Sequence, residues 1–156
     1  MINARIDITQ GLDGEPVVLA LFDLGSGEIA ASAHAVRAIS GERFRTASMS
    51  TDDVLELREL TALADELADL ASRSGVSTVV LRPARLSAYR NALTQFVESR
   101  DEAEWIREED REPLHSAREL LWPLGDLAAD AMRAALEPGT PHSCGCVCDG
   151  SGGFGL

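Results

Sequence analysis

The 156-residue chain has no lysine, only three cysteines and no long apolar run. Without lysine it cannot build the glycine-rich loop that holds nucleotide phosphates with a lysine. An odd number of cysteines cannot all pair within one chain, which argues against a disulfide-held scaffold. No apolar stretch approaches the ~18–20 residues of a membrane span, and residues 1–5 lack the pattern of a signal peptide. We therefore expect a cytoplasmic protein without a membrane partner.

Negative charge dominates the chain. Its 26 acidic residues face 14 basic residues, all arginine, which gives a formal net charge of −12. Broad binding to nucleic acid depends on basic side chains that neutralise phosphates, so this charge argues against it. The 45% of hydrophobic residues and 26% of charged residues are ordinary for a globular protein, and the length suits about one domain.

Three groups of acidic residues, far apart in the sequence, are candidate metal ligands. Asp23 follows an apolar run, Glu109 and Asp110 lie in a late charged segment, and Asp126 and Asp130 open the last predicted helix. A Mg²⁺ or Mn²⁺ site needs two or three oxygen ligands that converge on one point, and distant segments can supply them. Such a site can position the attacking and leaving oxygens of a phosphodiester.

Hydrophobic patterning predicts an α/β fold with three consecutive antiparallel strands. We expect a short edge strand within residues 6–9, a strand buried on both faces at residues 16–22, and further strands at residues 28–39 and 43–49. The short turns between the last three of these strands imply an antiparallel meander.

Helical signals follow from residue 50 onward. Ser50 and Asp53 form a capping-box start for a helix that we expect to end near residue 74. Residues 76–81 are predicted to form a buried parallel strand, and residues 86–99 a helix. Residues 101–112 are a charged run without a clear strand. Two more helices are predicted, at residues 115–121 and 126–136, with a break at Pro123 and Gly125 between them.

These elements divide the chain into three parts. Residues 1–14 are an N-terminal lead-in, residues 15–138 the domain, and residues 139–156 a flexible tail rich in Cys, Gly and Ser. The order of three antiparallel strands, α-β-α crossovers and C-terminal helices is that of a ribonuclease H-like domain, a fold-level analogy.

Four motifs carry a family resemblance. Residues 21–30 (Leu-Phe-Asp-Leu-Gly-Ser-Gly-Glu-Ile-Ala) resemble the Asp-x-Gly turn of RuvC-like Holliday-junction resolvases and their short YqgF-like relatives. Residues 75–83 are similar to the strand after the family's first helix. Glu-Asp-Arg at residues 109–111 resembles its Asp-Glu-Arg segment, and residues 126–131 resemble the opening of its final helix. Together the motifs span about residues 17–136.

The resemblance implies a metal-dependent nuclease that cleaves structured nucleic acid with Mg²⁺ or Mn²⁺. Asp23 would bridge the metals, Glu109 or Asp110 would take a second position, and Asp126 or Asp130 a third. Arg111 would contact a phosphate.

Several alternatives remain open at this point. Residues 51–57 also resemble the start of the first helix in ribonuclease H proper, which would make Glu56 a metal ligand. The domain can equally be a catalytically inactive accessory module that binds a protein partner. Each acidic residue also has a purely structural explanation. Asp23 fits a turn residue, Asp126 fits a helix N-cap, and Glu109 and Asp110 fit a solvated face. Oligomeric state and substrate are not fixed by the sequence.

Two histidines and the tail complete the candidates. His115 is a possible proton shuttle near Glu109, whereas His34 lies among small residues of a predicted strand and fits a packed or exposed residue better. In the tail, four ligands alternate along the chain and match a Zn²⁺ inventory: His142, Cys144, Cys146 and Cys148. Their alternate spacing differs from that of structural zinc sites, which usually separate paired cysteines by two to four residues. Capture of Zn²⁺ or Cu⁺ by the thiolates, a substrate segment for post-translational modification, and reduced thiols without a role all stay open.

Overall fold

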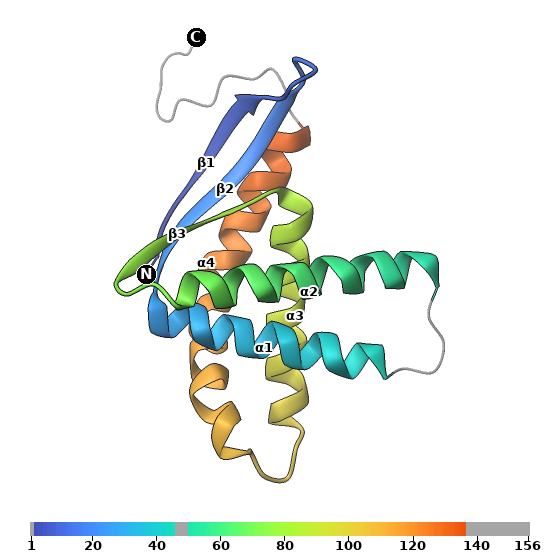
Figure 1. Ribbon diagram of the computed structural model, residues 1–156, viewed down its shortest axis with the longest axis vertical. Helices are drawn as coiled ribbons and strands as arrows, with labels where there is room; N and C mark the ends of the chain where they lie inside the picture. Colours follow the sequence, from blue (N-terminus) through green and yellow to red (C-terminus); the bar gives the residue numbers. More distant parts are fainter. Residues whose placement is uncertain (1, 46–49, 137–156) are drawn as a thin grey trace.

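The computed structural model describes residues 2–45 and 50–136. They form a three-stranded sheet and four helices, so the expected α/β class is confirmed. The elements are, in chain order, β1 (Asn3–Gln10), β2 (Pro16–Gly25), α1 (Ser26–Phe44), α2 (Thr51–Ala71), β3 (Val76–Leu81), α3 (Pro83–Asp101) and α4 (Glu108–Leu136). Figure 1 shows the hairpin of β1 and β2 rising beside the end of α4, and the pair α1 and α2 crossing α3 and α4.

Strand β2 is the centre of the sheet, with β1 and β3 on either side. Side chains of a strand alternate between its two faces, and in β2 the buried set is Val18, Ala20, Phe22 and Leu24. The residues between them are only partly buried. The prediction of a strand buried on both faces is therefore wrong, because helices cover the sheet from one side.

Strand β3 runs antiparallel to β2, not parallel as expected. The prediction assumed a single crossover helix between neighbouring strands. Instead α1 and α2 form a helical pair that returns the chain to the end of β2, where the amide of Ser26 donates to the carbonyl of Gly75 (3.0 Å). Because β3 starts where β2 ends, it must run the other way. The predicted edge strand at residues 6–9 exists and is longer, as β1.

Residues 28–39 are helical, so the second predicted strand is wrong. Five alanines within this segment favour a helix, and the buried Ile29, Ala33, Val36 and Ser40 follow helical spacing. The carboxylate of Glu28 accepts a bond from the amide of Gly25 (3.0 Å), which satisfies one free donor at the start of α1.

The third predicted strand, residues 43–49, is contradicted at its start. Arg43 and Phe44 belong to the last turn of α1. Residues 46–49 lie outside the described part of the chain.

Helix α2 begins as predicted. The amide of Asp53 donates to the Ser50 hydroxyl (3.2 Å), and the amide of Ser50 donates to the Asp53 carboxylate (3.0 Å). This reciprocal pair is the capping box. Helix α3 also confirms its prediction and extends it, because Pro83 occupies the first helical turn, where a missing N–H costs nothing.

Helix α4 is continuous, so the predicted break near Pro123 and Gly125 is wrong. Both residues, and Pro113, lie inside the helix. An uninterrupted apolar stripe explains this, since buried residues recur at helical spacing on both sides of the proline: Leu114, Ala117, Leu120, Leu124, Leu127, Ala131 and Ala134. Burial of that stripe outweighs the hydrogen bond that Pro123 cannot make. Gly125 allows close approach of Arg90, whose Nε would lie 3.1 Å from an added Cβ.

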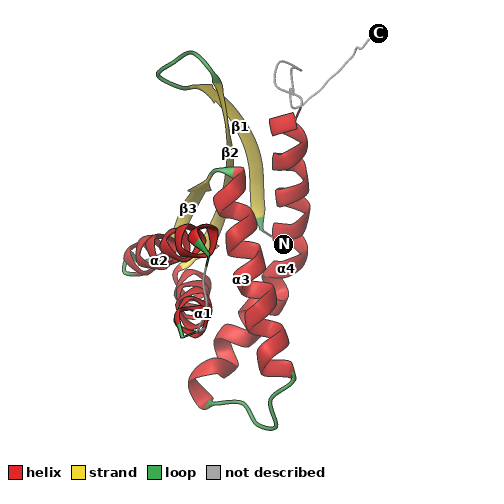
Figure 2. Ribbon diagram, turned by 90° about the vertical axis from the view of Figure 1, so that its right-hand side faces the viewer, coloured by secondary structure: helices red, strands yellow, loops and turns green. Residues whose placement is uncertain are grey.

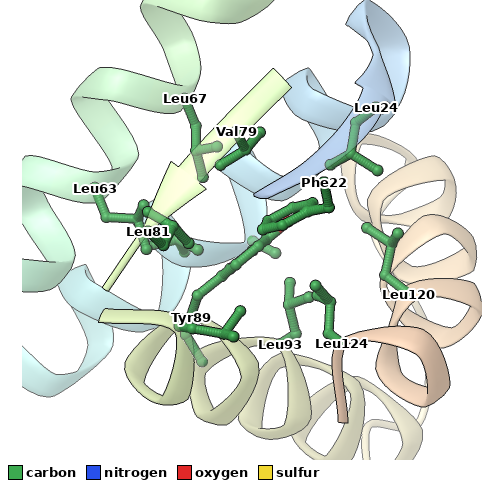
Figure 3. Close-up of a cluster of buried hydrophobic side chains, with 14 of the residues drawn as sticks. Phe22, Leu24, Leu63, Leu67, Val79, Leu81, Tyr89, Leu93, Leu120 and Leu124 are labelled. Atoms are coloured by element: carbon green, nitrogen blue, oxygen red, sulfur yellow. The ribbon is translucent and has the colours of Figure 1, made fainter. Parts of the chain in front are cut away.

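The core lies between the inner face of the sheet and the helices. Figure 3 shows Phe22 at its centre, with Tyr89 of α3 below it and Leu120 of α4 beside it. The rings of Phe22 and Tyr89 stack with centroids 6.1 Å apart. The Tyr89 hydroxyl shares a 2.5 Å hydrogen bond with Ser32 of α1, so a buried polar contact ties α1 to α3.

Candidate functional site

Asp23 lies near the end of β2, on the face of the sheet that points away from the helices. Its carboxylate accepts hydrogen bonds from Thr78 of β3 (2.5 Å) and Asn3 of β1 (3.0 Å). These two bonds, helped by the charge of Arg5, lower the pKa of Asp23. The carboxylate is therefore ionised and joins all three strands.

Asp110 has a different setting, in the first turn of α4. It is 5% exposed, and its two oxygens meet His34 Nε2 (2.7 Å) and Arg100 Nε (3.2 Å). Burial alone would raise the pKa of Asp110, but the bond from His34 and the charge of Arg100 lower it. Arg100 continues the chain of contacts to Glu42 of α1 (2.8 Å). We call His34, Glu42, Arg100 and Asp110 the buried ionic cluster, after the buried carboxylate of Asp110 at its centre; the other three side chains are partly exposed.

The buried ionic cluster joins three helices. His34 and Glu42 come from α1, Arg100 from α3 and Asp110 from α4. The guanidinium of Arg100 also lies 4.5 Å from the ring centroid of Phe96, a cation–π contact. A surface hollow of about 440 Å³ borders the cluster and is lined by Trp105 and Arg107 among others.

Glu109 and Arg111 are exposed beside this cluster. Glu109 lies 3.9 Å from Arg107, and Arg111 lies 3.5 Å from Glu108. Both contacts are between exposed side chains within one short stretch, and such pairs contribute little. His115, the candidate proton shuttle, pairs with Glu119 (3.3 Å) rather than with Glu109.

Asp126 and Asp130 lie in the second half of α4. The prediction that Asp126 caps a new helix is wrong, because it is an interior residue of α4. Both residues are exposed, and Asp130 pairs with Arg133 (2.9 Å). Glu56, the ligand in the ribonuclease H alternative, pairs with Arg43 (3.0 Å).

The candidate acids thus occupy separate settings. Asp23 lies on the sheet, Asp110 between α1, α3 and α4, and Asp126 on the exposed side of α4. Among residues 2–45 and 50–136, no group of three or more His, Cys, Asp or Glu side chains could hold a metal ion. The tail ligands His142, Cys144, Cys146 and Cys148 lie outside these ranges.

The sequence did not indicate two features of the structure. The first is the buried ionic cluster, since His34 was expected on a strand and no pattern links it to Asp110. The second is an apolar sheet surface. Strand pairing puts Leu21 opposite Val80 on the side away from the helices, because Phe22 and Val79 occupy the buried side. We call this surface the outer sheet face.

The outer sheet face has an aliphatic centre and a polar border. Its residues are Asn3, Arg5, Asp7 and Thr9 of β1, Val17, Leu19, Leu21 and Asp23 of β2, and Val76, Thr78 and Val80 of β3. Val76 is 71% exposed and Val80 48%. Figure 2 shows α3 and α4 on one side only of the hairpin of β1 and β2. No helix of the described part of the chain packs on the outer sheet face.

In the described ranges, none of the helices combines the length and the apolar character needed to cross a membrane. Comparison with protein-family models, with curated proteins and with solved structures found no match to this chain.

Proposed function

We propose that this chain is a non-catalytic interaction domain that binds a protein partner through the outer sheet face. The main support for this proposal is the aliphatic centre of that face. It consists of Val17, Leu19 and Leu21 of β2 and Val80 of β3, and no described helix packs over it. A contiguous apolar surface with a polar border is typical of a protein-binding site.

Charge favours one kind of partner. The chain has a formal net charge of −12 and an isoelectric point near 4.6, so its long-range field attracts a basic protein and repels nucleic acid. The partner would match the face with aliphatic side chains and would bring a net positive charge. Its association rate would fall as salt rises.

The nuclease and its ribonuclease H-like fold stay predictions with less support. A two-metal site needs carboxylate oxygens that are free to bind the ions and close enough to share them. Both oxygens of Asp23, and both of Asp110, already accept bonds from neighbouring side chains. The helical segment 28–39 also replaces a strand on which the fold analogy depends. Mn²⁺-dependent cleavage of branched DNA that Asp23→Asn abolishes would support the nuclease.

Site-specific photo-crosslinking in the native host tests the interaction directly. A photoreactive phenylalanine analogue replaces Val80 in the full chain, and a control chain carries it at Val54 of α2, whose exposure (42%) is close to that of Val80 (48%). We expect a discrete adduct with a basic protein from position 80 and none from position 54. Equal adducts from both positions, no adduct at all, or an adduct with nucleic acid would contradict the proposal.

Binding of the identified partner then provides a quantitative test. The Val80→Gln variant removes apolar surface without changing charge, and we expect it to weaken binding about tenfold. Val54→Gln, the matched change on α2, should leave the affinity unaltered. Unchanged affinity of Val80→Gln would show that the partner uses another surface.

A further inference from the structure

Strand β1 is a long and open edge of the sheet. It pairs with β2 over all eight of its residues, and in the described part of the chain no strand lies on its other side. Every residue of β1 except Ile6 is exposed. Its outer row of N–H and C=O groups therefore has no strand partner among the described residues.

Edge strands of natural proteins usually carry a feature that prevents such pairing, such as a proline, a bulge, inward charges or a covering element. Strand β1 (Asn-Ala-Arg-Ile-Asp-Ile-Thr-Gln) contains no proline, and its register with β2 advances residue by residue without a bulge. Its two charges, Arg5 and Asp7, have opposite signs and flank Ile6. They do not repel a second copy of the same strand.

We infer that β1 pairs antiparallel with β1 of a second copy of this chain, about a two-fold axis at Ile6. This arrangement places Arg5 of each copy opposite Asp7 of the other, on the outer sheet face of both. Directly opposite side chains of unlike charge stabilise antiparallel strands, and like charges destabilise them. A two-fold interface makes this contact twice.

The same charges select this register over its neighbours. Paired residues must share a face of the sheet, so the axis must pass through a residue, and the nearest alternatives to Ile6 are Arg5 and Asp7. An axis at Arg5 puts two arginines opposite each other, and an axis at Asp7 puts two aspartates opposite each other. Only the axis at Ile6 makes both contacts attractive.

The inferred dimer joins two three-stranded sheets into one sheet and places two outer sheet faces side by side. It uses the edge of β1 and does not depend on the proposed partner, which binds the face. If the partner proposal is also correct, each dimer presents two binding sites, and avidity follows.

Sedimentation velocity of the full chain over a range of micromolar concentrations tests the inference. We expect a dimer for the natural sequence and more than about tenfold weaker dimerisation for Arg5→Asp and for Asp7→Arg, since each variant makes both contacts repulsive. Mixing the two variants should restore a dimer with one copy of each, because its charges are then complementary. The double variant Arg5→Asp/Asp7→Arg should dimerise on its own.

Matched controls separate this interface from a general effect of charge. Arg58→Asp on α2 and Glu98→Arg on α3 make the same changes of charge at exposed positions away from β1, and both should leave the dimer intact. Circular dichroism checks that every variant is folded. A monomeric natural sequence, single variants that dimerise like it, or a mixture that stays monomeric would each overturn the inference.

Discussion

Asp110 offers the sharpest test of how the structure uses its acidic residues. Its replacement by asparagine keeps the shape of the side chain and removes the charge. His34 and Arg100 both donate to this carboxylate, and the amide can accept from only one of them without presenting its NH₂ group to the other. The change therefore breaks a contact between α1, α3 and α4 without creating a cavity.

The size of the effect follows from the exposure of the partners. A buried hydrogen bond to a charged group contributes about 1.5–3 kcal/mol. The side chains of Arg100 and His34 are 17% and 37% exposed, and Arg100 keeps its contact with Glu42, so water and Glu42 compensate in part. We expect Asp110→Asn to lower the free energy of unfolding by about 2 kcal/mol, which for a chain of this size is roughly 6 °C in Tm.

The pH dependence of this loss has a defined sign. Because folding lowers the pKa of Asp110, its carboxylate stabilises the folded state above the unfolded pKa of about 3.9. That stabilisation disappears as the pH falls through the folded pKa. The difference in Tm between the natural chain and Asp110→Asn should therefore be full at neutral pH and shrink in acid.

Thermal and denaturant unfolding of both chains provide the measurement. Glu109→Gln is the matched control, because it removes the neighbouring charge at an exposed position and should change stability by less than about 0.5 kcal/mol. An effect of Asp110→Asn as small as that of Glu109→Gln would refute the reasoning. A difference that grows in acid would refute it as well.

Three further predictions concern local structure and the tail. Tyr89→Phe should destabilise the chain by about 1–2 kcal/mol because it leaves the buried Ser32 hydroxyl without its partner, and adding Ser32→Ala should recover part of the loss in thermal unfolding. Ser50→Ala removes the cap of α2 and should cost about 1 kcal/mol in denaturant unfolding, whereas Ser72→Ala at the other end of α2 should cost less. The tail prediction is that the full chain binds Zn²⁺ and that replacing Cys144, Cys146 and Cys148 by Ser abolishes it; zinc analysis that finds equal metal in both chains contradicts the prediction.

The parts of the fold that local signals specify were predictable. The Ser50–Asp53 capping box fixes the start of α2, and Gly75 precedes β3 where the strand was expected. The segment 28–39 is predicted as a strand because its Val and Ile residues are frequent in strands. Helical spacing of Ile29, Ala33 and Val36 was the signal that would have corrected it.

The direction of β3 and the surroundings of Asp110 depend on contacts between distant segments. Strand β3 is antiparallel because two helices, not one, separate it from β2. Asp110 meets His34 across 76 positions of the sequence, and no spacing pattern reveals such a pair. The acidic residues of the sequence therefore suggest one shared metal site, whereas in the structure Asp23 and Asp110 accept hydrogen bonds from different side chains.

We expect that Asp23, Asp110 and Asp126 do not share a metal ion. Titration of the ¹⁵N-labelled full chain with Mn²⁺ tests it most directly, because a bound paramagnetic ion broadens the amide signals around its site. We expect that the amides flanking these three residues do not broaden together at substoichiometric Mn²⁺. Joint, saturable broadening at all three positions, lost in Asp23→Asn, would show a shared metal site and favour the metal-dependent nuclease.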